Sequence, residues 1–233
     1  VTFNRGEKHN SLSLEMFETD VQQVLDEYLA GLITEEHLLS AGRAWRNYKS
    51  DYRPLVEFAK EHHMPVIAAN APRRYVNRVS RLGAAKLEEL SPQARRFLPP
   101  LPYGAASPEY AAKFHKLMEE MRLEQERRGE AVRRLDPFKG LEAQSLWDAG
   151  MAFSIADILT RNPDKRVIHC NGGFHTAQRL GIVDHLARYR PGTSMLVVTI
   201  VAAESFPDFD EDQMRGEGDF VIVTDPANRT GDA

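Results

Sequence analysis

The sequence predicts an α/β protein with a mostly parallel sheet flanked by helices and an inserted helical subdomain. Short apolar or β-branched runs alternate with segments whose apolar residues recur at helical spacing, and this alternation is typical of βαβ units. We expect strands at residues 1–3, 12–16, 65–69, 167–170, 195–201 and 220–223. We expect helices at residues 51–61, 72–82 and 181–189.

The stretch from about residue 84 to residue 160 interrupts this alternation. Its proline cluster at residues 99–102 cannot lie inside a helix, whereas long helices are predicted after Ser107 and from Pro137. We therefore divide the chain into an α/β core, residues 1–83 and 161–233, and an inserted helical subdomain, residues 84–160.

Composition limits the classes of function. The chain has 233 residues and a net charge of −4, which argues against nucleic acid as a partner because such binders are usually basic. No apolar run approaches the ~20 residues that a membrane-spanning helix needs. Cys170 is the only cysteine in the sequence, so an internal disulfide is excluded.

The first two predicted strands are unusually close in sequence. Only about eight residues separate Phe3 from Leu12, whereas a crossover between parallel strands needs about a dozen or more. Either these strands are antiparallel, or a helix that belongs between Asn10 and Ser11 is absent from the chain. We favour the second explanation.

Two loops share the pattern Gly-x-x-His, at residues 6–9 and 172–175. Each follows a predicted strand, and glycine allows the sharp turn that leaves a strand. Ligands bind beyond the carboxyl ends of strands in open α/β sheets, so His9, His175 and the carboxylate of Glu7 are expected to face one crevice. The alternative is that each histidine only braces its own loop.

Glu15 lies near the end of an otherwise apolar predicted strand, at the same expected sheet edge as His9. A carboxylate there is costly unless it is paired or binds a ligand. Carboxylates and imidazoles together suit a divalent metal, general acid–base catalysis or hydrogen bonds to an anion. The candidate metal or catalytic site is therefore Glu7, His9, Glu15 and His175.

Arg73 is a candidate anion-binding residue. It follows Pro72 at the start of a predicted helix, where the helix dipole also favours negative charge. The alternative is a salt bridge from Arg73 to Glu15 or Glu7.

The helical insertion contains residue types that serve as axial ligands of haem. Tyrosine, histidine and methionine all have this role in proteins. The candidates are Tyr103, Tyr110, His115 and Met118, with Met121 on the same stripe as Met118. The alternative is that these side chains form part of the core.

The sequence resembles the ChaN-like haem-binding proteins of the haem-binding-uptake/Tiki superfamily, which also includes erythromycin esterases and Tiki proteases. The matching segments span nearly the whole chain in a consistent order; they are residues 6–9, 14–18, 52–59, 65–73, 144–148 and 171–175. This family usually has a helix after its first Gly-Glu-x-His, which agrees with the absent helix. The resemblance implies an α/β core with a helical subdomain.

The resemblance implies two alternative functions. The first, which we favour, is a haem-binding lipoprotein of the bacterial cell envelope for haem uptake or storage. Such a protein would be a homodimer that holds two cofacial haems, and its partner would be an outer-membrane haem receptor. The second is a metal-dependent hydrolase of the Tiki type. It would bind Mn, Co or Zn through Glu7, His9, Glu15 and His175, with Arg73 steadying an anionic substrate.

Overall fold

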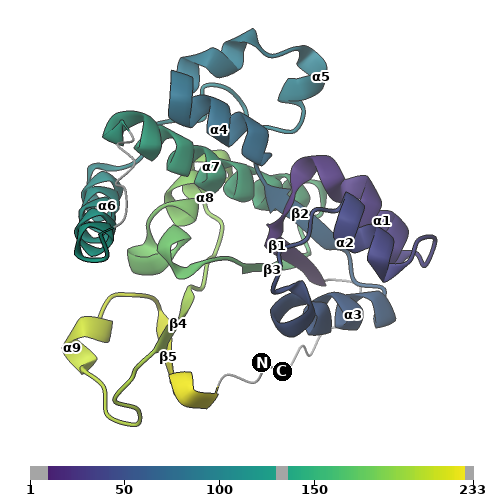
Figure 1. Cartoon of the computed structure of the whole chain (residues 1–233). Helices are drawn as coiled ribbons and strands as arrows, with labels where there is room; N and C mark the ends of the chain where they lie inside the picture. The colour runs from purple at the N-terminus through teal and green to yellow at the C-terminus, as the bar shows by residue number, and fades with distance from the viewer. Residues whose placement is uncertain (1–9, 130–135, 229–233) are drawn as a thin grey trace.

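The computed structural model describes residues 10–129 and 136–228. Its central sheet has the strand order β2-β1-β3, from β1 (Asn10–Glu18), β2 (Val66–Asn70) and β3 (Arg166–Cys170). Both pairings are parallel, and Leu12 of β1 lies opposite Val66 of β2 and Ile168 of β3. The carboxyl ends of all three strands therefore lie at one edge of the sheet (Figure 1).

Side chains of β1 alternate between two differently composed faces. Leu12, Leu14 and Met16 pack into a core with the helices on one side of the sheet. These helices are α1 (Gln22–Leu29), α2 (Glu35–Ala41) and α3 (Arg53–Glu61), with the short turns η2 (Thr19–Val21) and η3 (Tyr48–Tyr52). The intervening positions of β1 are polar and include Ser13 and Glu15, which are buried as well.

The long helix α7 (Pro137–Arg161) contacts β2, α4 (Arg73–Leu82) and α8 (Ile182–Tyr189). Gly150 allows the close approach of α7 to the end of β2, because a Cβ there would lie 3.1 Å from the backbone nitrogen of Ala71. Helix α7, which lies almost wholly in the predicted inserted subdomain, thus contacts three elements of the predicted α/β core. The division into a core and an inserted subdomain stays a prediction.

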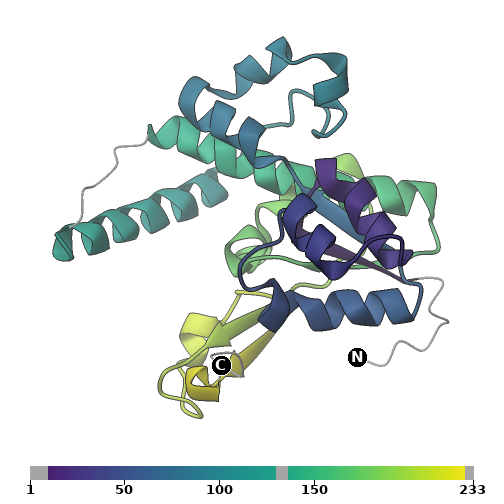
Figure 2. The ribbon, with the colours of Figure 1, turned by 45° about the vertical axis from the view of Figure 1, so that its right-hand side comes forward.

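The elements between β2 and α7 lie above and to the left of the central sheet (Figures 1 and 2). They are α4, the turn η4 (Ala84–Glu89), α5 (Pro92–Arg95) and α6 (Pro108–Arg127). The Ser107 side chain caps α6 by accepting a hydrogen bond from the backbone nitrogen of Tyr110, and Asp136 caps α7 in the same way. Capping and a proline in the first turn explain why both starts could be predicted.

The last two strands form a separate parallel pair rather than an extension of the central sheet. They are β4 (Val198–Ala202) and β5 (Phe220–Thr224), accompanied by α9 (Glu211–Met214) and η7 (Pro226–Asn228). Ile200 and Phe220 are 67% and 62% exposed, so this small sheet leaves apolar surface uncovered. In the described parts of the chain, no helix is both long and apolar enough to cross a membrane.

The prediction of an absent helix between Asn10 and Ser11 stays a prediction. In the chain as it stands, both residues lie within the continuous strand β1, where Asn10 pairs with Arg166 and Ser11 with Val167. The strand predicted at residues 1–3 lies outside the described residues.

Candidate functional site

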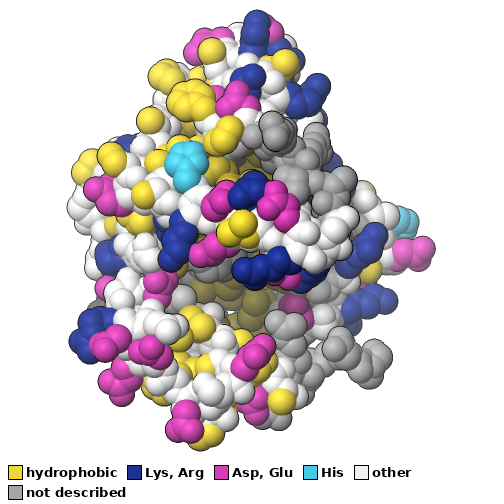
Figure 3. Space-filling view, turned by 60° about the vertical axis from the view of Figure 1, so that its left-hand side comes forward, with side chains coloured by type: hydrophobic (Ala, Val, Ile, Leu, Met, Phe, Trp, Pro, Cys, Tyr) yellow, Lys and Arg dark blue, Asp and Glu magenta, His cyan; other side chains and the backbone are white. Residues whose placement is uncertain are grey.

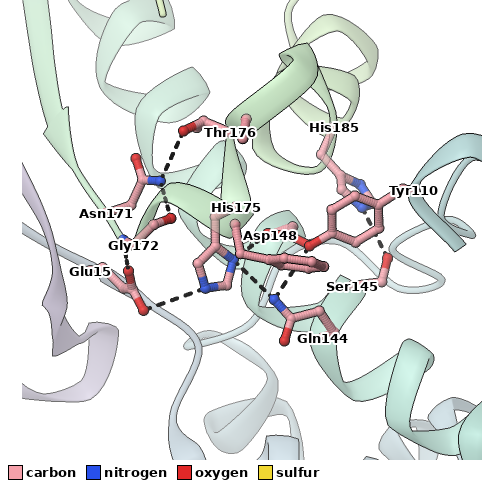
Figure 4. A network of polar contacts seen from close by, with 12 residues as sticks. Glu15, Tyr110, Gln144, Ser145, Asp148, Asn171, Gly172, His175, Thr176 and His185 are labelled. Atoms are coloured by element: carbon pink, nitrogen blue, oxygen red, sulfur yellow. Dashed lines mark hydrogen bonds and ion pairs between the residues drawn. The ribbon is translucent and has the colours of Figure 1, made fainter. Parts of the chain in front are cut away.

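The parallel sheet brings Glu15 and His175 together, as the sequence predicts. Glu15 lies near the end of β1, and His175 lies in the turn η5 (Gly173–His175) after β3. The backbone nitrogen of Gly172 donates to Glu15 Oε2 over 2.6 Å, and Glu15 Oε1 lies 3.5 Å from His175 Nε2. Figure 4 shows the two side chains facing one another across the sheet edge. His9 and Glu7, the other two predicted members, lie outside the described residues.

Helix α7 supplies two further members of this network. Asp148 is completely buried, and its Oδ1 lies 2.6 Å from His175 Nδ1. The side-chain nitrogen of Gln144 lies 3.2 Å from the same ring nitrogen and donates to the Tyr110 hydroxyl over 3.3 Å (Figure 4). His175 is thus held between two carboxylates, one from β1 and one from α7.

The pKa values of this network follow from burial and charge. Burial alone would lower the pKa of His175, but Asp148 and Glu15 raise it to about 10. Burial raises the pKa of Asp148, opposed by His175. Burial would also raise the pKa of Glu15, yet His175 and the Gly172 N–H bring it below its ordinary value. We conclude that His175 is an imidazolium at neutral pH, paired chiefly with Glu15 and Asp148.

Two other histidines, His169, which is half-buried, and His185, which is buried, are neutral at neutral pH. Burial lowers the pKa of His169 to about 4, and its Nδ1 lies 2.9 Å from the Ser13 hydroxyl. Burial likewise lowers the pKa of His185 to about 4, and its Nε2 lies 3.0 Å from the Ser145 hydroxyl. Of these three histidines, the one flanked by carboxylates is therefore the one that carries charge.

The His175 turn is fixed from two sides. Gly181 has a φ of +62°, and a Cβ there would lie 2.6 Å from the carbonyl oxygen of His175, so a larger residue would displace the turn. Lys113 of α6 donates to the carbonyl oxygens of Phe174 and Ala177, each over 3.0 Å. The ammonium also lies over the Phe174 ring, 4.6 Å from its centre. Helix α6 therefore clamps the loop that carries His175.

The network as described is not arranged as a metal centre. Both ring nitrogens of His175 already face a carboxylate. Within residues 10–129 and 136–228, no group of three or more His, Cys, Asp or Glu side chains is placed to hold a metal ion. Glu15 and His175 are 9% and 8% exposed, and neither lines the two cavities described below. The geometry is that of a buried, hydrogen-bonded ion cluster.

An open cleft of about 900 Å³ lies between α4, α6 and α7. Its walls are mainly apolar and include Phe114, Met118 and Trp147. Its charged lining comprises Arg73, Arg122, Glu119 and Asp136. Arg122 forms ion pairs with Glu119 and with Glu126. Hydrophobic side chains gather on the side of the molecule that carries α6, around a hollow in the upper half of that face (Figure 3). The volume is typical of sites for small ligands and cofactors.

The four predicted haem-ligand candidates divide into two pairs. His115 and Met118 line this cleft, His115 exposed and Met118 half-buried. Tyr103 and Tyr110 are buried away from it, and the Tyr103 hydroxyl donates to the carbonyl oxygen of Glu142 over 2.8 Å. Burial and the neighbouring Asp148 carboxylate raise the pKa of Tyr110, which opposes the tyrosinate form. The role of each candidate stays a prediction.

Arg73 also lines the cleft rather than the Glu15–His175 network. Its predicted salt bridge to Glu15 is wrong, because Glu15 is engaged by His175 and the Gly172 nitrogen and makes no ion pair with Arg73 among the described residues. Arg74 instead pairs with Asp20. The predicted alternative partner, Glu7, lies outside the described residues.

Sequence reasoning missed Asp148 as a member of the network. A signal was present, because Asp148 is a lone carboxylate in the stretch of α7 whose neighbours Leu146, Ala149 and Met151 are all buried. A charged residue at a core position of a helix usually has a partner. Its partner was not identifiable, since His175 lies 27 residues later on another element.

Parallel strands and a buried ion cluster at their carboxyl edge define a small α/β protein, with a mainly apolar cleft on its helical side. Residues 2–186 match the family described as haem-binding uptake, Tiki superfamily, ChaN. The match covers most of the chain, and the protein therefore belongs to this family, as the sequence predicts.

One solved structure supports the same assignment. The fold is similar to that in "Cofacial heme binding to ChaN of Campylobacter jejuni", with a TM-score of 0.60 and 20% sequence identity. The similarity covers 91% of this chain and 72% of that chain. A likeness at this identity shows a shared fold. A comparison with curated proteins gives no match.

Proposed function

We propose that the protein binds haem in the cleft between α4, α6 and α7, for haem uptake or storage in the bacterial cell envelope. The observation that carries the proposal is that His115 and Met118 line one apolar cleft together with Arg73. Membership of the haem-binding uptake family supports the choice of ligand.

The chemistry of the lining fits haem. Haem supplies an iron with axial positions, a flat apolar ring and two carboxylates. Phe114, Met118 and Trp147 provide apolar walls, while Arg73 suits a carboxylate because a guanidinium can bind one through two hydrogen bonds. His115 and Met118 are three residues apart on α6 and therefore lie on one face of this helix.

We assign His115 as the residue that holds the iron. It is the only histidine among the residues that line the described cleft, and imidazole is a common axial ligand of haem. Its exposure leaves it free to approach a ligand, whereas Tyr103 and Tyr110 would have to leave the core. Met118 is the second candidate on the same face.

The hydrolase is not favoured over this function. The residues proposed for it that the structure describes, Glu15 and His175, are buried in mutual contact and line neither cavity. A substrate would have to open the network to reach them. The finer predictions from the family resemblance, namely a lipid anchor, a homodimer and an outer-membrane receptor as partner, belong to the same proposal of a haem-uptake role.

Titration of the protein with haemin tests this function. The wild type should give a saturable Soret shift near one haem per chain, and His115→Ala should weaken binding at least tenfold. His37→Ala is the matched control, because His37 is exposed on α2 at the far side of the molecule from α6 (Figure 1). A weak, non-saturable response of the wild type would refute haem binding. Equal affinities of the wild type and His115→Ala would refute the assignment of His115.

A further inference from the structure

A second cavity of about 860 Å³ lies between β3, α7, α8 and residues 193–198. It has no lining residue in common with the cleft between α4, α6 and α7. Its volume is also in the range of ligand sites. Haem binding in the first cleft leaves this second cavity without a role.

The cavity has an apolar interior and a cationic lining. Ile155, Leu159 and Leu186 provide part of the apolar wall, and they are buried in the core that α7 and α8 share. Lys165, Arg166 and Arg190 also line it. None of its lining residues is acidic. Because the whole chain carries a net charge of −4, this local excess of positive charge does not follow from the average composition.

The three cations are available to a ligand. Within the described chain, none of them forms an ion pair, in contrast to nearby Arg161, which pairs with Asp157. The Arg190 guanidinium donates only to the hydroxyl of Thr193 over 3.0 Å, which also lines the cavity. Unpaired guanidinium and ammonium groups beside a cavity favour an anionic group.

The mouth of the cavity is apolar and uncovered. β3 is the outer strand of the central sheet, and its Ile168 is 39% exposed beside the cavity. Leu196, which also lines the cavity, is 67% exposed. An apolar chain that entered the cavity here would cover both side chains and gain the free energy of their burial.

We propose that this cavity binds a long-chain fatty acid. Its hydrocarbon chain packs against Ile155, Leu159 and Leu186, and its carboxylate lies near Lys165 and Arg166. Charge complementarity selects the carboxylate, and the apolar lining selects the chain. The proposal is independent of haem binding, since the two cavities have separate linings.

Fluorescence titration with cis-parinaric acid, a naturally fluorescent fatty acid, tests the proposal on the full chain. The wild type should bind one molecule saturably. The double variant Lys165→Gln/Arg166→Gln should weaken binding at least tenfold, while Arg161→Gln, which removes a nearby cation that does not line the cavity, should not. Ser194→Trp should abolish binding, because Ser194 is exposed and its replacement fills the mouth without disturbing the core.

Two further measurements separate this site from the haem cleft and from non-specific association. The methyl ester of the same acid should bind at least tenfold more weakly, because it keeps the chain and loses the charge. Saturation with haemin should leave the affinity for the acid unchanged. Absent or non-saturable binding, equal affinity for acid and ester, or stoichiometric displacement by haemin would each overturn the proposal.

Discussion

The buried network around His175 and the cleft around His115 each contain a histidine, but the two histidines have different surroundings. In the network, both ring nitrogens of His175 face carboxylates and the side chains are almost inaccessible. In the cleft, His115 is exposed beside apolar walls and two arginines. Gln144 lines the cleft and also contacts His175, so the two regions are neighbours. The two histidines therefore differ in accessibility and in charged partners.

Removal of one member of the network should have the largest effect on stability. Asp148→Ala leaves the His175 imidazolium without one of its buried partners, and breaking a buried pair in this way costs about 3–5 kcal/mol. Urea unfolding measures the loss. The control is Asp157→Ala on the same helix, a half-buried residue paired with Arg161, which should cost about 1 kcal/mol or less. A loss from Asp148→Ala as small as that of the control would show that the network does not stabilise the fold.

The network also predicts how stability depends on pH. The folded pKa of His175 is raised from 6.5 to about 10, so its contribution is complete below pH 6.5 and is lost as pH rises through 10. The pKa of Glu15 is lowered from 4.5, so its contribution is present above that pH and is lost in acid. Unfolding free energies measured from pH 6 to pH 10 should fall for the wild type and change less for His175→Gln. Parallel curves for the two proteins would contradict the assigned charge of His175.

The cleft should show the reverse behaviour, with a large effect on binding and a small one on stability. His115→Ala should weaken haemin binding by about 10- to 100-fold, equivalent to about 1.4–2.7 kcal/mol. Because His115 is exposed, its replacement should change the unfolding free energy by no more than about 0.5 kcal/mol. Haemin titration and urea unfolding of the same preparation test both halves. If His115→Ala lowers the unfolding free energy but leaves the affinity for haemin unchanged, then His115 stabilises the fold and does not bind haem.

The smallest effect is expected at the charged lining of the cleft. Arg73→Gln removes one guanidinium from an exposed position, and we expect about a threefold to tenfold loss of haemin affinity. Arg74→Gln is a close control, since the adjacent arginine pairs with Asp20 and does not line the cleft. Equal losses in the two variants would show that Arg73 acts only through the overall charge.

Local signals in the sequence predicted much of the fold. The starts of α6 and α7 follow from capping by Ser107 and Asp136 next to prolines, and these signals act within one helical turn. The helices α1 and α2, of eight and seven residues, were not predicted. The separate β4–β5 pair could not be predicted, since the partner of a strand depends on contacts between distant segments.

The sequence predicted those contacts of the Glu15–His175 network that follow from the order of the strands alone. Glu15 and the His175 loop end neighbouring parallel strands, so their meeting follows from topology. Arg73 also follows a strand, but it lies on a helix that turns toward α6, and its direction depends on tertiary packing. The same holds for Tyr110, whose periodicity on α6 does not reveal that it faces the buried Asp148.

We propose that His115 holds the iron of haem in the cleft and that His175 serves the fold. The most direct test is the absorption and electron paramagnetic resonance spectrum of the ferric haem complex of His115→Tyr, recorded beside the wild type and His175→Gln. We expect His115→Tyr to replace the imidazole-bound signature with that of a phenolate-bound iron, and His175→Gln, once folded, to keep the wild-type spectrum. An unchanged spectrum in His115→Tyr together with a changed one in His175→Gln would contradict this proposal.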